Sequence, residues 1–379
     1  MSKLDQPASH YMSLRGGLPN LNQKLFRNEP IAVAFLGGSI TEGYGASDPN
    51  KTSWRAITES YLRERFSEEK VTCINAGVGG TNSTFGAHRM REHVLLNGEI
   101  DLLFVEFSVN DGEDREESIR GMEGIVRQCR RLSPQADICF LYTAAEKNLS
   151  SGMPFNIAVH EEVATHYHIP SVNFAANIYN LIEAGQTRWE ELAPDLVHPN
   201  DAGYALYAQY VQTFLETALA RESSSAYKPG IPALPSPKDE RNYEYAAMLD
   251  SRQAVQQDGF ILKEAQPEPL INWRYHSEHL FTEIKEASLS FTVNGRSAGL
   301  LLLCGPDTGI FEYSLNGLIF NQVQLFDDWC LGAFRPVIAM FPLQPDNHNM
   351  RITVRNTGLK DERSTGTSVR VLKVLSNIV

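Results

Sequence analysis

The stretch IAVAFLGGS, residues 31–39, decides the fold class of this chain. Its six apolar residues are followed by two glycines and then by Ser39, the first polar side chain. A short apolar run that ends in glycine is typical of a strand buried on both faces of a parallel sheet. Apolar residues then recur at helical spacing over residues 54–66, behind a Thr-Ser pair that fits a helix N-cap. The stretch therefore predicts the first strand-and-helix unit of an α/β domain.

The same alternation of strand and helix continues along the chain. Later apolar runs predict further strands, and patterns of helical period lie between them and after the last one. Strands joined by helices form right-handed crossovers, so the sheet is expected to be parallel and covered by helices on both faces. We therefore expect residues 1–220 to form one α/β domain. The strands expected after the first lie at residues 71–74, 102–107, 138–142 and 171–174.

The composition changes after residue 220. Consecutive serines and then closely spaced prolines open residues 221–260, as is typical of a linker. Short β-rich runs separated by turn signals such as Asn294-Gly295 follow, and helical periodicity largely disappears. We expect a linker and connecting segment over 221–260 and an antiparallel, jelly-roll-like β-sandwich over 261–379. A chain of 379 residues is long enough for two separate cores.

The overall charge argues against several classes of function. The formal net charge is −12 and basic residues form no stripe, so we expect binding neither to nucleic acid nor to an anionic membrane surface. No apolar run is long enough to span a bilayer, and residues 1–17 lack the apolar core of a secretory signal. The five cysteines are widely spaced and odd in number, which favours reduced thiols in a cytoplasmic protein. The oligomeric state stays open, and a homo-oligomer is compatible with the sequence.

Small or polar residues follow the expected strands at the ends where functional groups collect in a parallel sheet. Ser39 comes after the first strand, Gly77–Gly80 after the second and Asn110 after the third. The segment Asp195–His198 lies in the loop before the last expected helix. The topology therefore predicts that these segments meet at one edge of the sheet.

Together these residues have the chemistry of nucleophilic catalysis. A serine hydroxyl needs a base to take its proton, and the base works better when a carboxylate fixes its tautomer. Asp195 and His198 supply both partners of Ser39 within a single turn. The Ser39 amide, a glycine amide such as that of Gly80, and the Asn110 side chain would suffice to stabilise an oxyanion.

At these positions the sequence resembles the SGNH, or GDSL, family of hydrolases. The resemblance covers about residues 28–218, and four blocks occur in the family's order. It implies a flavodoxin-like three-layer α/β/α fold and ester hydrolysis that uses no metal and no cofactor. The blocks are GGSIT at 37–41, NAGVGG at 75–80, SVND at 108–111 and DLVHP at 195–199.

The resemblance also assigns a role to each candidate residue. It makes Ser39 the nucleophile, His198 the base and Asp195 the third member of the triad. Gly80 and Asn110 become oxyanion donors beside the amide of Ser39.

Two residues depart from the family pattern. Gly38 stands where the family usually has an aspartate, and Ser108 stands where it usually has a glycine. Neither change removes a proposed catalytic group, but both alter the loops that shape the oxyanion hole. The glycine donor is also a choice of register between Gly80 and Gly79, of which we take Gly80.

Some residues near the blocks admit both a functional and a structural interpretation. Tyr44 and Trp189 stand close to triad blocks, where they would either flank the substrate or pack the rim. Asp111 is expected to cap the turn that follows it. The pair His166 and His168 has the spacing of metal ligands but no third ligand nearby, so a surface or interface role is expected and no metal site.

The second domain contains a set of aromatic and acidic residues that would suit a carbohydrate. Aromatic rings stack on sugars and carboxylates bind hydroxyl groups, although a plain sandwich core and a solvated surface explain the same residues. The set comprises Trp273, Trp329, Asp307, Asp327 and Asp328.

The expected function is that of a serine acylesterase acting on a small-molecule or oligosaccharide ester. The expected substrate is a small acyl group on a sugar, acetyl first of all, because the appended β-domain suits a bulky polar leaving group. Members of the resembled family also include acyltransferases, lipases and thioesterases, and these stay as alternatives. A carbohydrate-binding protein with a vestigial hydrolase domain is the alternative from outside enzymology.

Overall fold

The computed structural model describes residues 11–96, 98–220 and 228–378. By its internal contacts the chain divides into unit 1, Met1–Glu244, and unit 2, Tyr245–Val379. The division falls inside residues 221–260, the segment expected to connect two domains. Of that segment, residues 221–227 lie outside the described residues, and residues 246–258 include two strands of unit 2.

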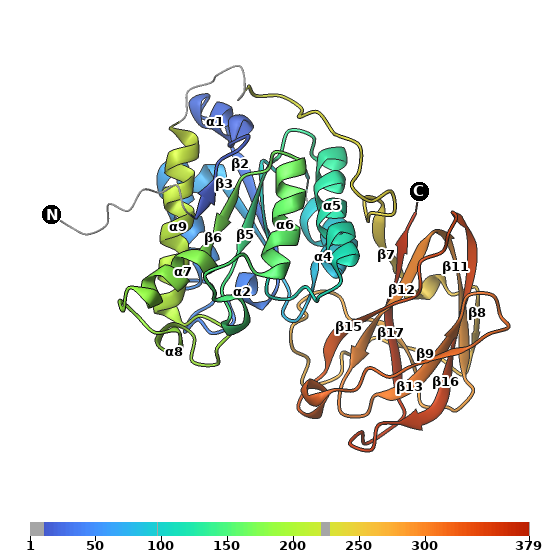
Figure 1. Ribbon diagram of the computed structural model, residues 1–379. Coiled ribbons are helices and arrows are strands. Elements are labelled where there is room, and N and C mark those ends of the chain that lie inside the picture. Colours follow the sequence, from blue (N-terminus) through green and yellow to red (C-terminus); the bar gives the residue numbers. More distant parts are fainter. Residues whose placement is uncertain (1–10, 97, 221–227, 379) are drawn as a thin grey trace. The chain divides into compact units, whose positions relative to one another are not determined.

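Unit 1 is built on a sheet of order β1-β6-β5-β4-β2-β3, shown in Figure 1. All neighbours from β3 to β6 are parallel, and only the short edge strand β1 is antiparallel. The parallel strands thus follow the flavodoxin-like order: β3 lies on one side of β2, and β4, β5 and β6 follow on its other side. The α/β fold class expected from the sequence is confirmed. The strands are β1 Met12–Ser13, β2 Ile31–Gly37, β3 Val71–Gly77, β4 Leu102–Glu106, β5 Asp137–Tyr142 and β6 Ser171–Asn173.

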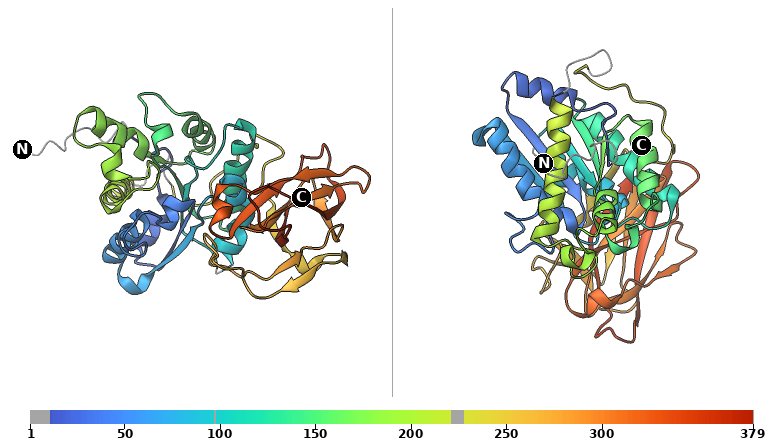
Figure 2. Two further views of the ribbon diagram at one scale, coloured as in Figure 1. Left: turned by 90° about the horizontal axis from the view of Figure 1, so that it is seen from below. Right: turned by 60° about the vertical axis from the view of Figure 1, so that its left-hand side comes forward.

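Helices cover both faces of this sheet (Figures 1 and 2). On one face α3 packs on α9, and on the other α4 packs on α5 and α5 on α6. Side-chain caps define where several helices begin: the Ser53 hydroxyl accepts the Ala56 amide at the start of α3, and Asn82 accepts the Phe85 amide before α4. The helices are α1 Pro19–Phe26, α2 Ser39–Glu42, α3 Trp54–Phe66, α4 Ser83–Met90, α5 Arg115–Leu132, α6 Phe155–His166, α7 Phe174–Glu183, α8 Trp189–Leu192 and α9 Asp201–Leu219.

The register of the central strands brings the functional loops to one edge. Gly37 at the end of β2 pairs with Gly77 of β3 on one side and with Glu106 of β4 on the other. The three strands therefore end at the same level, and the loops that follow them start side by side. This is the edge at which the sequence predicted Ser39 and Asn110 to meet.

Unit 2 consists of two antiparallel sheets. One has the order β15-β12-β17-β10-β9, with β7 also paired to β17, and the other has the order β14-β13-β16-β11-β8. The expected β-sandwich is confirmed. The strands are β7 Ala246–Asp250, β8 Gln256–Asp258, β9 Ile261–Lys263, β10 His279–Thr282, β11 Ser288–Gly295, β12 Ser297–Cys304, β13 Gly309–Ser314, β14 Asn321–Val323, β15 Arg335–Met340, β16 His348–Lys360 and β17 Val369–Asn377.

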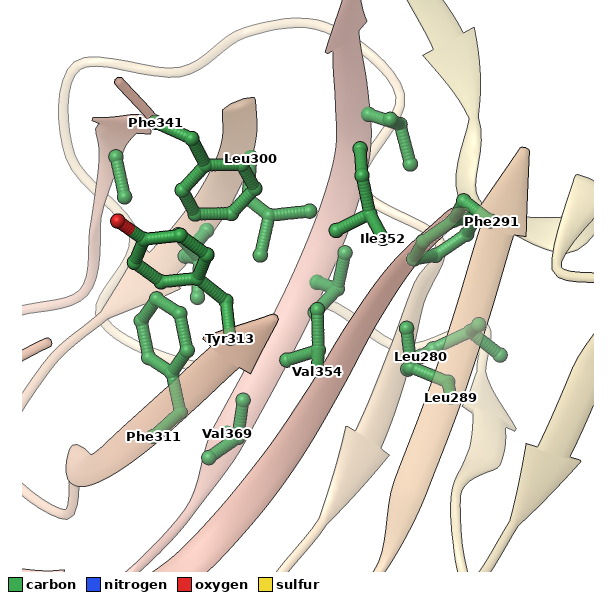
Figure 3. Close-up of a cluster of buried hydrophobic side chains, with 14 of the residues drawn as sticks. Leu280, Leu289, Phe291, Leu300, Phe311, Tyr313, Phe341, Ile352, Val354 and Val369 are labelled. Atoms are coloured by element: carbon green, nitrogen blue, oxygen red, sulfur yellow. The ribbon is translucent and has the colours of Figure 1, made fainter. Parts of the chain in front are cut away.

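The core of unit 2 consists of side chains from both of its sheets. Figure 3 shows aromatic and aliphatic residues pointing toward one another, and the rings of Tyr313 and Phe341 stack with centroids 4.0 Å apart. Burial of such side chains is the main favourable term in folding. The labelled members also include Phe291, Leu300, Phe311, Ile352, Val354 and Val369.

Within the part of the chain that the structure describes, no helix is both long and apolar enough to cross a membrane. All five cysteines are free thiols, and four of them are buried. Localisation in the cytoplasm stays a prediction.

Candidate active site

The turn between β2 and α2 presents Ser39 at the edge of the sheet. Gly38 is extended, and Ser39 is the first residue of the short helix α2. Neither glycine before it has room for a side chain: a Cβ on Gly37 would lie 2.2 Å from Thr41 Oγ1, and one on Gly38 would lie 2.3 Å from Asn110 Oδ1. The departure from the family at Gly38 thus has a structural reason, because the Asn110 amide occupies the space that a side chain would need.

The three residues expected to form a triad lie in one hydrogen-bonded chain. Ser39 Oγ is 2.8 Å from His198 Nε2, and His198 Nδ1 is 2.6 Å from Asp195 Oδ2. Asp195 Oδ1 also accepts the backbone amides of Val197 and His198, at 3.0 and 2.7 Å. The Asp195 carboxylate therefore orients both the backbone and the ring of the histidine.

Hydrogen bonding keeps Asp195 ionised. Partial burial acts to raise the pKa of this carboxyl, but the hydrogen bonds from the His198 amide and ring and from the Val197 amide outweigh it. The pKa of Asp195 lies below its ordinary value as a result. A carboxylate in this state favours the imidazole tautomer that has its proton on Nδ1 and leaves Nε2 facing Ser39.

The turn that holds Asp195 and His198 is strained and braced. Leu196 has a φ of 65°, in the left-handed region that a branched side chain rarely adopts. Its carbonyl accepts the Trp189 indole N–H at 2.9 Å and the Glu146 amide at 2.9 Å. Trp189 itself is buried, so its geometry favours bracing this turn over contacting a substrate.

Tyr44 lies beside His198, the candidate base. Its ring centroid is 4.5 Å from that of His198, and 55% of the tyrosine is exposed. Gly45 lets this loop approach, since a Cβ there would lie 2.6 Å from the Pro199 carbonyl oxygen. Tyr44 is thus an exposed aromatic side chain beside the Ser39–His198 pair.

The two candidate glycine amides differ in what they bind. The Gly79 amide donates to Glu42 Oε2 at 2.7 Å. Gly80 has a φ of 71°, and a Cβ placed on it would meet nothing within 4 Å. Since Gly79 is already engaged, the geometry favours Gly80 as an oxyanion donor. Thr81, the next residue, borders the same space, with its carbonyl oxygen 3.6 Å from the Cβ position of Gly38.

Two buried ionisable residues beneath the site were missed by sequence reasoning. Glu106, at the end of β4, accepts the hydroxyls of Thr41 and Thr143 at 3.0 and 2.7 Å. Complete burial raises its pKa, despite the hydrogen bonds that it accepts. Arg89, which is completely buried in α4, is the other. A glutamate inside the apolar run LLFVEF was a signal that could have identified the first of them.

Asp111 has a structural environment. Its carboxylate accepts the Ser83 amide and hydroxyl at the start of α4, both at 2.7 Å, and lies 2.8 Å from His160 Nε2. Among the residues that the structure describes, no group of three metal-ligating side chains occurs. His166, the last residue of α6, lies 2.8 Å from the Ser236 carbonyl through its Nε2.

The candidate carbohydrate residues of unit 2 have very different exposures. Trp273 is buried, whereas Trp329 is 65% exposed on the short helix Asp328–Leu331. The acidic members form ion pairs: Asp307 with Arg370, Asp327 with Arg335 and Asp328 with Arg363. Of this set, Trp329 alone presents an exposed aromatic face.

Residues 35–206 match the model of the GDSL-like Lipase/Acylhydrolase family. These residues form a GDSL-type acylhydrolase domain. The resemblance seen in the sequence and the expected enzyme class, carboxylic ester hydrolase, are both confirmed. A search of curated proteins found no match.

Solved structures share the fold of the whole chain. A two-domain esterase active on acetylated mannans has a TM-score of 0.84 and 24% identity, with 98% of each chain covered. The same kind of esterase co-crystallised with mannopentaose gives a TM-score of 0.82 at the same identity and coverage. At this level of identity the likeness shows a common fold with both units included.

Proposed function

We propose that the chain is a serine esterase that removes acetyl groups from carbohydrates, with Ser39 as nucleophile, His198 as base and Asp195 as the orienting carboxylate. The observation that carries the proposal is the continuous chain of contacts from Ser39 Oγ through the imidazole to Asp195 Oδ2. A base already at 2.8 Å from a serine hydroxyl is placed for proton transfer as that hydroxyl attacks.

In the first half of the reaction Ser39 Oγ attacks the ester carbonyl carbon while its proton passes to His198 Nε2. The carbonyl oxygen becomes an oxyanion, which the amides of Ser39 and Gly80 and the side chain of Asn110 stabilise. Each such donor contributes roughly 2.7–4 kcal/mol to transition-state stabilisation. The tetrahedral species collapses when the sugar oxygen leaves and takes the proton from His198 Nε2.

In the second half water hydrolyses the acetyl-serine. His198 Nε2 takes a proton from the water as its oxygen attacks the acetyl carbon, and the same donors hold the second oxyanion. Collapse releases acetate and returns the proton to Ser39 Oγ. Asp195 stays ionised throughout and stabilises the imidazolium formed in each half.

Two observations support a carbohydrate as the leaving group. The fold of both units is shared with an esterase active on acetylated mannans, over 98% of each chain. Trp329 offers an exposed ring in unit 2, of the kind on which a sugar stacks. The free thiols further support a reducing, cytoplasmic setting for the reaction.

A substrate panel tests this function. Wild type and Ser39→Ala are compared on acetylated manno-oligosaccharides and on nitrophenyl esters of increasing acyl length. We expect wild type to release acetate and to prefer the shortest acyl chain, and Ser39→Ala to lose activity. Preference for long acyl chains would favour a lipase, and acyl transfer to an added sugar acceptor would favour a transferase. Equal turnover by both proteins, or none by either, would contradict esterase activity at this site.

A further inference from the structure

Arg89 lies completely buried beneath the edge of the sheet that carries Ser39. It projects from α4, and its guanidinium donates to the Gly37 carbonyl at 2.7 Å, to the Ala76 carbonyl, and to Thr81 Oγ1 at 3.2 Å. Burial of a cation is unfavourable unless hydrogen bonds replace its water. A guanidinium is suited to such a place because its rigid fork of donors can bind several oxygens at once.

Each partner of Arg89 belongs to a segment that carries a proposed oxyanion donor. Gly37 lies two residues before Ser39, and its carbonyl also accepts the Val78 amide at 3.0 Å. Ala76 and Thr81 lie on either side of Gly80. One guanidinium therefore ties the backbone of the nucleophile turn to the backbone of the glycine loop.

The third donor segment is in contact with the same guanidinium. The Arg89 Cζ atom lies 5.9 Å from the centroid of the Phe107 ring, and Phe107 precedes Asn110 by three residues. Gly86 of α4 permits this approach, because a Cβ there would lie 2.5 Å from Phe107 Cζ. The backbone N–H of Asn110 donates to the Phe107 carbonyl at 3.0 Å, which links Asn110 to the residue that packs against the guanidinium.

We propose that Arg89 is a positioning residue for the oxyanion hole, which holds the amides of Ser39 and Gly80 and the turn of Asn110 in one fixed arrangement. The inference rests on the proposed function. Oxyanion donors stabilise a transition state only when they are aligned in advance, so a shift of the two loops relative to each other weakens catalysis more than it weakens binding.

The test compares Arg89→Met and Arg89→Lys with wild type in the full chain. Methionine keeps most of the unbranched stem of the side chain without its charge or donors, and lysine keeps the charge but lacks the planar fork of donors. With nitrophenyl acetate we expect kcat to fall about 100-fold in Arg89→Met while KM changes less than about threefold. The inhibition constant of a boronic acid, whose serine adduct places an oxygen in the oxyanion hole, is expected to rise in parallel.

Arg120→Met is the matched control. Arg120 is also buried and forms ion pairs with Glu117 and Asp239, neither of which belongs to a segment that carries a proposed oxyanion donor. We expect its loss to lower the melting temperature and to leave kcat and boronic acid affinity within about twofold of wild type. If Arg89→Met does not fold, Thr81→Val removes one acceptor of the guanidinium and is expected to lower kcat about tenfold.

The outcomes separate this inference from the proposed function. If wild type is active, Ser39→Ala is inactive, and both Arg89 variants keep wild-type kcat and boronic acid affinity, the positioning role is wrong and the esterase stands. Equal losses in Arg89→Met and Arg120→Met would also overturn the role, since general destabilisation would explain them. If wild type and Ser39→Ala show the same turnover, the proposed function fails and the inference fails with it.

Discussion

At Gly38 the absence of a side chain leaves room for Asn110 beside the turn that carries Ser39. The family usually has an aspartate at this position, and here Asn110 Oδ1 would lie 2.3 Å from any Cβ on Gly38. The glycine therefore lets the proposed amide donor approach the turn that carries Ser39. The sequence identified the departure, but the distance between residues 38 and 110 depends on the tertiary fold.

We expect Gly38→Ala to displace the Asn110 side chain and to lower kcat about 100-fold, the effect of losing one oxyanion donor. The φ of −86° at this position is accessible to alanine, so the melting temperature is expected to change by only a few degrees. Steady-state kinetics with nitrophenyl acetate and a thermal melt check both parts. Unchanged kcat in a folded variant would show that Asn110 does not contribute from this position.

Glu106 leads to a prediction about its protonation state. Burial raises its pKa above the ordinary value of a glutamate, which makes the neutral carboxylic acid easier to form beneath the nucleophile turn. We expect Glu106→Gln, which resembles that form, to keep kcat within about threefold. Glu106→Ala leaves the Thr41 and Thr143 hydroxyls without their partner and is expected to lower both stability, by about 1–3 kcal/mol, and kcat. A glutamine variant as impaired as the alanine variant would instead indicate a need for the charge.

His88 predicts a loss of stability in acid. Its complete burial lowers its pKa from 6.5 to about 4, although it contacts the Thr84 carbonyl. Above pH 6.5 the ring is neutral in both states and has no effect. Below it the unfolded chain binds the proton first, so stability falls until about pH 4, by roughly 3 kcal/mol in total.

The measurement is the free energy of unfolding of wild type and His88→Gln between pH 7.5 and 4. We expect the gap between them to shift in favour of the variant as pH falls through this window. A constant gap would show that His88 is not the group that titrates.

At the scale of elements, the loop between α8 and α9 carries His198, the proposed base, two residues after the strained residue Leu196. Leu196 adopts its left-handed conformation between Asp195 and His198, and a non-glycine residue in that region costs of order 1–3 kcal/mol. The bonds from Trp189 and Glu146 to its carbonyl offset part of that cost. Strain of this kind persists only where the surroundings specify the conformation.

Trp189→Phe is expected to keep the packing of α8 but to lose the indole bond to the Leu196 carbonyl. A lost hydrogen bond of this kind costs about 1 kcal/mol, or roughly 2–4 °C in melting temperature. We expect kcat to fall about five- to tenfold, because the turn no longer holds the His198 ring in its position beside Ser39. The matched control is Trp273→Phe, which loses a similar indole bond, to the His276 carbonyl in unit 2. Equal kcat in both variants would refute the bracing role.

The elements also show what the sequence could predict. Strands β2, β4 and β5 are apolar runs buried in the sheet, so their positions and the loops after them followed from the pattern. Strands such as β8, Gln256–Asp258, are exposed and polar and pair only through tertiary contacts, so no period indicated them. Arg89 was missed for the same reason, because its partners are two backbone carbonyls and the Thr81 hydroxyl, which only the tertiary fold brings together.

At the scale of the molecule, one chain combines an acylhydrolase domain with a β-sandwich. The order of the four blocks was enough to predict the first fold and the meeting of Ser39 with His198. The substrate could not be predicted in this way, because the residues that select a sugar are scattered, and burial decides which of them face solvent. Trp273 and Trp329 looked equivalent in the sequence and differ in exposure in the structure.

We expect Trp329→Ala to weaken the binding of manno-oligosaccharides to unit 2 about tenfold, equivalent to ~1.4 kcal/mol, and to leave nitrophenyl acetate hydrolysis unchanged. Leu331→Ala, an exposed residue of the same short helix, is the control and is expected to change neither. Calorimetric titration with the oligosaccharide and kinetics with nitrophenyl acetate check the two parts. Wild-type affinity for the oligosaccharide in the Trp329 variant would show that this ring does not bind the sugar.

The most direct test of the account is the site of covalent labelling by a serine-reactive phosphonate, located by mass spectrometry of the digested protein. The contacts of Ser39 with His198 and of His198 with Asp195 predict one adduct, on Ser39, in the wild type. They also predict that His198→Ala reacts far more slowly and that Ser39→Ala is not labelled. An adduct on another residue, or labelling of Ser39→Ala at the wild-type rate, would contradict the account.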